Sequence, residues 1–329
     1  MPTFRLVAVC ALVAAVAFAA CGSPSSGSSG SKRRLSIATG GTGGVFYPYG
    51  GGIAKIITEH LPNTEATAEV TAASVDNLKF LKQGNSDLAF TMADMAQDAV
   101  TGRDVFSDFG KVPVRTLAVL YSSYSHLVAR ADAGISGIAD LRGRVVSTGA
   151  AGSGTTVIAR RMLQAAGLDP SRDIREQSLG VAQSVDAIKD GKIDAFFWNG
   201  GLPTASILDL VNTPGVKANF IPTDTQLPRL EQMFGPKLYY RDIIPKGTYN
   251  NEAEIPVVAV ANLLVASEEM PEALAHDITQ VLFDQQAALA AIHPQAKTLS
   301  LKTALTGSPV PFHPGAIRFY RERNVWTAQ

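Results

Sequence analysis

The stretch LSIATGGTGGVFYPYGGGIAKII, residues 35–57, sets out the local architecture that the rest of the chain repeats. Residues 35–39 predict a β-strand, and the apolar residues between positions 50 and 61 recur at helical spacing. A glycine-rich loop separates the two, and glycine lets a backbone turn sharply and approach a ligand closely. A strand, a glycine loop and a helix in this order indicate an α/β unit.

The same order returns in the second half as VVSTGAAGSGTTVIARRML, residues 145–163. In each half a later helix ends at a glycine and leads into another strand, as QGNSDLAF at 83–90 and DGKIDAF at 190–196. Strands that alternate with helices favour parallel sheets and the α/β class. The sequence therefore predicts two similar α/β lobes.

The lobe boundaries follow from the last third of the chain. A strand-like run at 257–266 precedes a long helical stretch at 270–292. We therefore expect residues 34–125 to form lobe I together with 258–329, and residues 126–257 to form an inserted lobe II. The chain would cross between the lobes twice.

The N-terminus predicts export. One positive charge precedes an apolar run at 6–20, which is shorter than the roughly 20 residues that a bilayer-spanning helix needs. The run ends in FAACG, residues 18–22, which resembles a bacterial lipobox. We expect 1–20 to be a lipoprotein signal peptide, Cys21 to carry the lipid anchor at the outer face of the cell membrane, and 21–33 to be a Gly/Ser-rich tether. An ordinary signal peptide with an incidental cysteine is the alternative.

Composition narrows the class of partner. Lys+Arg and Asp+Glu both number 29, so the chain has no basic field for nucleic acid. The two cysteines are Cys10 in the signal and Cys21, so the folded region should contain no disulfide. We expect a monomer that binds no nucleic acid.

The glycine loops are the candidate ligand site, because a helix that follows such a loop points unpaired N–H groups and a positive dipole end at it. Strand ends and a Trp-Asn-Gly-Gly turn offer further hydroxyl, amide and aromatic groups. The predicted ligand contacts are Gly43, Gly44, Phe46, Tyr47, Ser74, Asn77, Asp94, Tyr121, Ser153, Gly154, Thr155, Thr156, Trp198, Asn199 and Gly200. Each also fits a structural role: the glycines as turns, the hydroxyls as helix caps, and Trp198 as a core residue.

Catalytic and cofactor motifs do not occur in the sequence. None of the five histidines stands in a His-x-x-x-His pattern, and no Gly-x-Ser-x-Gly follows a strand. The Gly41 loop lacks the third glycine of the dinucleotide fingerprint, and no Gly-Lys-Ser/Thr marks a P-loop. We expect no enzyme activity, no cofactor and no metal.

Together these segments resemble the TAXI family, the solute receptors of TRAP transporters. The residues that carry the resemblance are the 40–44 loop with Tyr47-Pro48, the SVDNL segment at 74–78, Asp94, the stretch from Tyr121 to Val128, GSGT at 152–155 and FWNGGLP at 197–203. The resemblance implies a type II periplasmic-binding-protein fold, two α/β lobes joined by a two-strand hinge. It also implies delivery to a TRAP permease, and a dicarboxylate or an acidic amino acid such as glutamate as the ligand.

The predicted function is thus an extracytoplasmic receptor that closes its cleft around a small carboxylate-bearing solute. Two alternatives remain open. The chain could be the substrate-binding lipoprotein of an ABC importer, or it could be an extracytoplasmic enzyme or a partner of a sensor.

Overall fold

The computed structural model describes residues 32–327. The predicted signal peptide 1–20, Cys21 and nearly all of the predicted tether lie outside the described residues. Within 32–327, no helix is both long and apolar enough to cross a bilayer. The first strand begins at Arg33, whose N–H donates to the carbonyl of Asn63 at 2.7 Å, so the last residue of the predicted tether is already part of the fold.

Ten strands form one mixed sheet in the order β2-β1-β3-β10-β4-β7-β5-β6, with β8 paired to β4 and β9 to β10. The strands are β1 (Arg33–Ala38), β2 (Thr64–Glu69), β3 (Leu88–Met92), β4 (Val114–Arg130), β5 (Val145–Ser147), β6 (Arg175–Gln177), β7 (Ala195–Gly200), β8 (Ala218–Ile221), β9 (Tyr240–Ile244) and β10 (Ile255–Ser267). Parallel pairs β1–β2 and β1–β3 lie at one end, and parallel pairs β5–β6 and β5–β7 at the other. The predicted α/β class with parallel sheets is therefore present twice.

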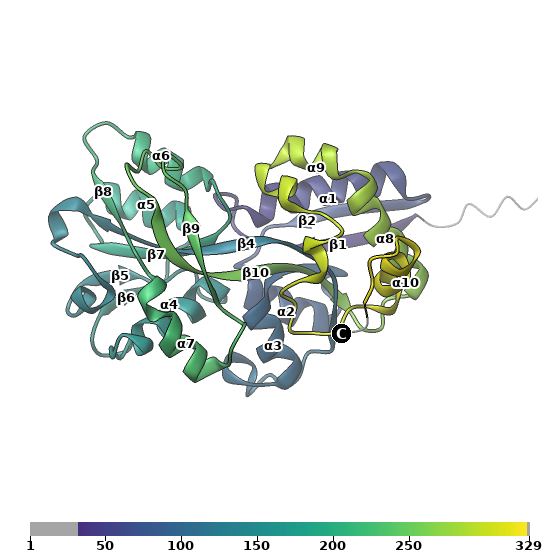
Figure 1. The fold of residues 1–329 in the computed structure, drawn as a ribbon, viewed down its shortest axis with the longest axis horizontal. Helices are drawn as coiled ribbons and strands as arrows, with labels where there is room; N and C mark the ends of the chain where they lie inside the picture. Colours follow the sequence, from purple (N-terminus) through teal and green to yellow (C-terminus); the bar gives the residue numbers. More distant parts are fainter. Residues whose placement is uncertain (1–31, 328–329) are drawn as a thin grey trace, which may run out of the picture. The chain divides into compact units, whose positions relative to one another are not determined.

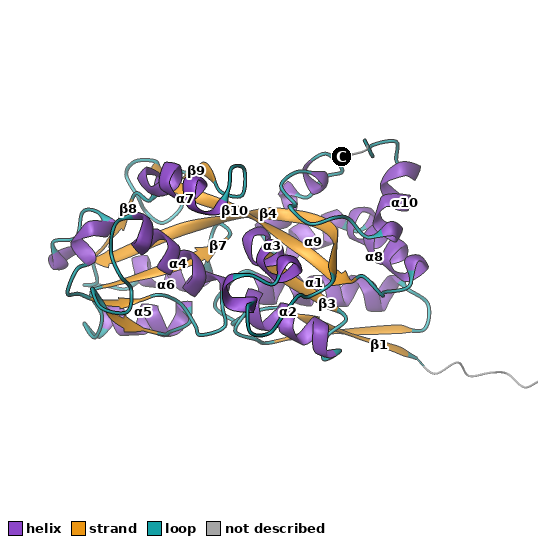
Figure 2. Ribbon diagram, turned by 90° about the horizontal axis from the view of Figure 1, so that it is seen from below, coloured by secondary structure: helices purple, strands orange, loops and turns teal. Residues whose placement is uncertain are grey.

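Two long antiparallel strands, β4 and β10, join these ends into two α/β lobes with a two-strand hinge (Figures 1 and 2). In lobe I the last part of β10 lies between β3 and the first part of β4 and pairs with both. In lobe II the second part of β4 pairs with β7 and β8. Apolar runs in the sequence predict two short strands, at 117–121 and 127–130. The structure has one strand of 17 residues there, because the chain continues without a turn from one lobe to the other. The predicted boundaries at 125/126 and 257/258 fall inside the two hinge strands.

Ten α-helices of the described residues flank the sheet on both faces (Figure 2). They are α1 (Phe46–His60), α2 (Ser74–Gln83), α3 (Ala93–Thr101), α4 (Gly154–Ala165), α5 (Val181–Lys189), α6 (Ala205–Asn212), α7 (Leu227–Phe234), α8 (Glu272–Asp284), α9 (Gln286–Ile292) and α10 (Pro314–Glu322). One core contains residues of α2, α3, α4 and α7 from both lobes. On the other face, α1, α8, α9 and α10 share a core in lobe I, and α5 and α6 share one in lobe II.

Local signals explain several of these helix boundaries. Helix α2 ends at Gly84, which adopts the left-handed conformation with φ of 71° that glycine tolerates best. The single helix expected at 270–292 is two helices, because Gln285 leaves helical geometry at φ −109° and ψ 20°. The break lets α9 bury Leu289, against which α1 packs through Gly52. Helices α3, α7 and α10 and strands β6, β8 and β9 were not predicted.

Candidate ligand-binding site

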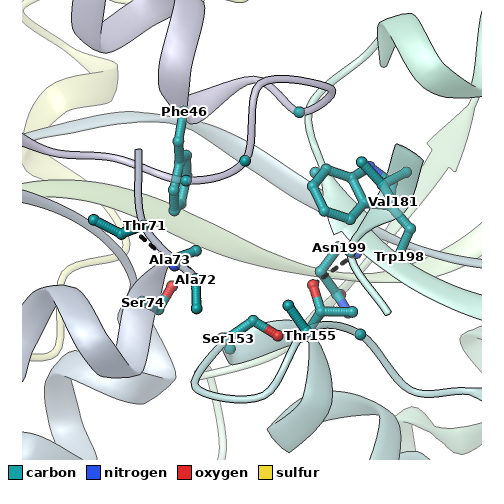
Figure 3. A pocket seen from close by; sticks show the side chains of 18 of the residues that line it. Phe46, Thr71, Ala72, Ala73, Ser74, Ser153, Thr155, Val181, Trp198 and Asn199 are labelled. Carbon is teal, nitrogen blue, oxygen red and sulfur yellow. Dashed lines mark hydrogen bonds between the residues drawn. The ribbon is translucent and has the colours of Figure 1, made fainter. Parts of the chain in front are cut away.

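A cavity of about 420 Å³ lies between the lobes, within the roughly 300–1,000 Å³ typical of small-molecule sites. Its walls come from loops and helix starts that are far apart in the sequence (Figure 3). Lobe I contributes the segments around Gly44, Ala73 and Tyr121, and lobe II those around Ser153 and Trp198. The cavity therefore opens where the sheet changes from one lobe to the other, a place that often holds ligands in α/β proteins.

Four helices begin at this cavity. Phe46 of α1, Ser74 of α2, Gly154 of α4 and Val181 of α5 each open a helix and each line the cavity. The first N–H groups of a helix have no intrahelical acceptor, and the aligned peptide dipoles place partial positive charge there. Helices α1, α4 and α5 carry no acidic residue in the first turn that would neutralise this charge.

Helix α2 differs because Asp76 lies in its first turn. The backbone N–H of Asp76 donates to the carbonyl of Gly152 at 3.1 Å, and its carboxylate lies against the same glycine, outside the cavity lining. Burial raises the pKa of Asp76, while nearby Lys79 lowers it. The carboxylate of Asp76 is therefore directed at the opposite lobe rather than at the cavity.

Two hydroxyl groups in the cavity wall accept a backbone N–H and still have a proton to donate. The oxygen of Ser74 accepts the backbone N–H of Met92 at 3.2 Å, and the oxygen of Thr155 accepts the backbone N–H of Asn199 at 3.3 Å. Each hydroxyl therefore keeps its proton for another acceptor. Ser74 belongs to lobe I and Thr155 to lobe II, and both lie next to a helix start.

Two further polar groups are buried at the cavity without a partner. Asn199 accepts the Ser125 hydroxyl at its side-chain oxygen, but its Nδ2 has no hydrogen-bond partner among the described residues. The hydroxyl of Tyr121 has none there either. Tyr121 is 4% exposed and Asn199 6% exposed, and both line the cavity. A buried donor without an acceptor is unfavourable by about 1–3 kcal/mol, so these groups favour a ligand that accepts hydrogen bonds.

Charged side chains are missing from the cavity wall. None of its lining residues within 32–327 is Asp, Glu, Lys, Arg or His. Burial raises the pKa of the Tyr121 hydroxyl well above its ordinary value, so this group also stays neutral. Any net charge bound here would face helix dipoles and neutral donors alone.

Aromatic rings from the two lobes form the apolar part of the site. Phe46 and Trp198 lie across the cavity from each other (Figure 3). The indole Nε1 of Trp198 donates to the Thr204 hydroxyl at 2.9 Å, and Thr204 is itself held by a 2.8 Å hydrogen bond from its N–H to the hydroxyl of Tyr249. A side chain at Gly44 would meet this ring, because an added Cβ would lie 2.8 Å from Cη2 of Trp198.

Ala73 has an unusual backbone at the edge of the cavity. Its φ of 94° and ψ of −146° lie in a region that is essentially reserved for glycine. The Ala73 N–H donates to the Thr71 hydroxyl at 3.0 Å, which in turn donates to the side-chain oxygen of Asn77. Non-glycine residues keep such conformations only where the surroundings impose them, and they cluster at functional sites. Here the conformation turns the start of α2 toward the cavity.

The lobes touch around the cavity, so the structure is that of a closed cleft. The Ser206 hydroxyl of lobe II donates to the carbonyl of Gly43 in lobe I at 3.1 Å. On the other side, the hydrogen bond from Asp76 to Gly152 joins α2 to the loop before α4. The cavity is enclosed between these two contacts.

Ten of the predicted ligand contacts line this cavity. They are Gly44, Phe46, Ser74, Tyr121, Ser153, Gly154, Thr155, Trp198, Asn199 and Gly200. The remaining five lie outside the cavity lining.

The structure gives these five other environments. Asn77 Nδ2 donates to three backbone carbonyls, which fixes the start of α2. Asp94 is buried in an ion pair with Arg161, and the Thr156 hydroxyl donates to the carbonyl of Ala150. Gly43 contacts Ser206 instead of the cavity, and Tyr47 is half-buried outside its lining. We therefore leave Gly43, Tyr47, Asn77, Asp94 and Thr156 out of the proposed contact set.

Sequence reasoning missed the contribution of α5. Gly180 and Val181 line the cavity. The apolar pattern of the sequence predicts a helix only over 185–190, whereas α5 begins at Val181. The glycine before the first apolar residue was the available signal for an earlier start. The contribution of Thr71–Ala73 to the cavity was also missed, because no sequence pattern predicts a strained backbone at an alanine.

Metal-binding clusters are also missing from the described part of the chain. Residues 32–327 contain no group of three or more His, Cys, Asp or Glu side chains placed to hold a metal ion. The cavity thus offers hydrogen bonds, helix dipoles and aromatic surface.

The fold, with its two lobes, two-strand hinge and enclosed cavity, is that of the type II periplasmic binding proteins. A binding protein component of an ABC phosphonate transporter from Pseudomonas aeruginosa is 10% identical over 80% of this chain and 79% of that chain, with a TM-score of 0.51. The GluR0 ligand-binding core in complex with L-glutamate is 12% identical over 82% of this chain and 98% of that chain, with a TM-score of 0.50. At these identities the likeness is one of fold.

The family follows from the sequence match. The model of the NMT1-like family matches residues 37–323, so the chain belongs to the NMT1-like family. The periplasmic aliphatic sulphonate binding protein SsuA from Escherichia coli is 18% identical over 88% of this chain and 83% of that chain, with a TM-score of 0.48. The matching model is not described as that of the TAXI family, and that resemblance stays a prediction.

Proposed function

We propose that this protein is an extracytoplasmic solute receptor that encloses a small anion, of the carboxylate type, between its two lobes. The observation that carries the proposal is the meeting of four helix N-termini at one cavity with unpartnered buried donors. Helix starts and oriented N–H groups bind anions without a basic side chain. The aromatic rings of Phe46 and Trp198 would cover the apolar part of the solute.

Closure of the cleft is the proposed mechanism. The ligand contacts of lobe I and lobe II are complete only when both lobes meet, so a bound solute stabilises the closed form by its differential affinity for it. The hinge strands β4 and β10 would bend, and opening would separate the two parts of the core that α2 and α3 share with α4 and α7. A membrane transporter would then recognise the closed form. The predicted lipid anchor on Cys21 would keep the receptor near that transporter.

For the transporter we propose an ABC importer. A neighbour with the same fold is a component of an ABC phosphonate transporter, and this supports an ABC partner more than the TRAP permease that the TAXI resemblance implies. The ABC and TRAP alternatives can be separated by measuring uptake of the ligand into vesicles that carry the permease encoded next to this protein's gene. Dependence on ATP supports the ABC importer, and dependence on an ion gradient alone would support the TRAP transporter.

Thermal-shift screening of the purified protein against small carboxylates, sulfonates and phosphonates tests receptor function. A ligand at a hundred times its Kd should stabilise the protein by about 2.7 kcal/mol, and the shift should saturate. The compound should be recovered chemically unchanged. Turnover of the compound would instead support an enzyme, and the lack of any saturable anion would contradict the proposal.

A further inference from the structure

Several polar side chains of the cavity wall have a donor that no described residue accepts. The start of α4 presents backbone N–H groups, and the hydroxyls of Ser74 and Thr155 already accept a backbone N–H each. Asn199 has its side-chain oxygen occupied by Ser125, and its buried Nδ2 has no hydrogen-bond partner among the described residues. The buried part of the wall therefore offers protons to the ligand and takes few from it.

Acceptor groups that could hold a cation are correspondingly scarce. Among the described lining residues there is no carboxylate, and Ser178 and Gln183, which could accept a hydrogen bond, are exposed at the rim. An ammonium group carries three donors and no acceptor. Inside this cavity it would lose its water, and it would also face the positive ends of helix dipoles.

The donors of the two lobes converge on the same point. A Cβ added to Gly154, the first residue of α4, would lie 3.1 Å from the hydroxyl oxygen of Ser74. The Ser74 hydroxyl of lobe I is thus next to the helix start of lobe II. The Met92 side chain also reaches this position, so Ser74 and the start of α4 meet at a packed contact between the lobes.

From this arrangement we infer that the receptor selects anions that carry no ammonium group, such as 2-oxo acids, over the amino acids of the same carbon skeleton. The inference rests on the proposed anion-receptor function and narrows its ligand class. Ser74, Thr155 and Asn199 are the specificity-determining residues. Their donors match a carboxylate and an adjacent carbonyl oxygen. An amino acid has an ammonium group in place of that carbonyl oxygen, and this group brings three N–H donors and no acceptor.

Matched ligand pairs test the inference directly. Calorimetric titration of the purified protein would compare 2-oxoglutarate with L-glutamate, and 4-methyl-2-oxopentanoate with L-leucine. We expect the oxo acid of at least one pair to bind at least about tenfold more tightly than its amino acid. An amino acid that binds as tightly as its oxo acid overturns this inference but leaves the receptor function intact. If none of these compounds binds at millimolar concentration, the anion-receptor proposal fails and this inference fails with it.

Two variants assign the selectivity to named residues. Thr155→Val removes a donor from the cavity and should weaken oxo-acid binding about tenfold, whereas Thr156→Val is the matched control, because the Thr156 hydroxyl donates to Ala150 within its own loop. Asn199→Asp keeps the acceptor for Ser125 and replaces the free Nδ2 with a carboxylate oxygen. This change should weaken oxo-acid binding and strengthen amino-acid binding. Equal effects of the two threonine variants, or an unchanged preference in Asn199→Asp, would contradict the assignment.

Discussion

Individual residues at the cavity are held in states that the fold imposes on them. Ala73 keeps a glycine-type backbone because its N–H and carbonyl are both bonded, the carbonyl to the N–H of Asn77 at 3.0 Å. His126 is buried in the hinge, where its Nδ1 lies 2.8 Å from the carbonyl of Tyr124. Ala73 is strained, and burial keeps His126 neutral by lowering its pKa; each can be tested by one substitution.

Ala73→Gly should make the protein more stable. The native conformation is strained for alanine by about 1–3 kcal/mol, whereas the larger backbone entropy of glycine in the unfolded chain offsets roughly 0.5–1 kcal/mol of the gain. Urea denaturation should show a net increase of about 1 kcal/mol. A less stable Ala73→Gly protein would show that the backbone here is not strained.

His126 should make stability depend on pH in the acid range. Burial lowers the pKa of His126 to about 4, below the ordinary value of about 6.5 that it regains on unfolding. The unfolded chain therefore binds the extra proton first, and stability is complete above about pH 6.5 and falls as the pH drops toward 4. At pH 5 the loss from this group is about 2 kcal/mol.

The comparison of wild type with His126→Gln isolates this group from other titrating residues. Urea denaturation at pH 7 and at pH 5 should show a smaller loss of stability in the variant than in the wild type. An equal loss in both proteins would mean that His126 does not stay neutral in the folded state.

At the scale of single elements, the glycine loop before α1 shapes the cavity because its glycines have no side chains. The loop approaches the opposite lobe so closely that Gly44 lies against the ring of Trp198. Gly41, in the same loop, has nothing within 4 Å of the position where a Cβ would be. Two glycines of one loop therefore differ in their tolerance of a methyl group.

Gly44→Ala should impair ligand binding, because the new Cβ keeps Trp198 from its place and hinders closure. We expect at least about a tenfold loss of affinity, equal to 1.4 kcal/mol, for any ligand found in the thermal-shift screen. Gly51→Ala, which lies outside the cavity lining and has nothing within 4 Å of its Cβ position, should bind normally. Calorimetric titration of both variants checks this, and equal affinities would show that the contact between Gly44 and Trp198 does not matter for closure.

Elements were predictable from sequence where local pattern decides them. The strand, glycine loop and helix order around Gly44 and around Ser153 was predicted, since apolar spacing and glycine act within a few residues. The continuity of β4 and the break at Gln285 depend on packing between distant segments, which leaves no local signal. Asp94 shows the same limit, because its partner Arg161 lies in the other lobe.

At the scale of the whole folded unit, a buried charge network ties the lobes together away from the cavity. Arg161 of α4 bonds Asp94 and Asp98 of α3 and Asp104 just beyond it, and Tyr239 joins it at 2.8 Å. Burial raises the pKa of Asp94, while Arg161 and the Tyr239 hydroxyl lower it. The guanidinium also lies over the ring of Phe234, 4.3 Å from its centre, so this contact is well enclosed.

Arg161→Gln should therefore destabilise the protein strongly, by about 3–5 kcal/mol, because it leaves buried carboxylates without their partner. Its neighbour supplies the control: Arg160 pairs with Glu176 and is 48% exposed, against 3% for Arg161. Arg160→Gln should change stability by no more than about 1 kcal/mol. Similar losses in both variants, measured by urea denaturation, would contradict the view that the network between the lobes is a main source of stability.

The central claim is that neutral donors of both lobes bind an anion. The most direct measurement is the affinity of the purified protein for 4-methyl-2-oxopentanoate and for its primary amide, which has a similar shape but no charge. The account predicts saturable binding of the acid and at least about a tenfold loss with the amide, since hydrogen bonds to charged groups contribute about 1.5–3 kcal/mol. Equal binding of the acid and the amide would contradict it.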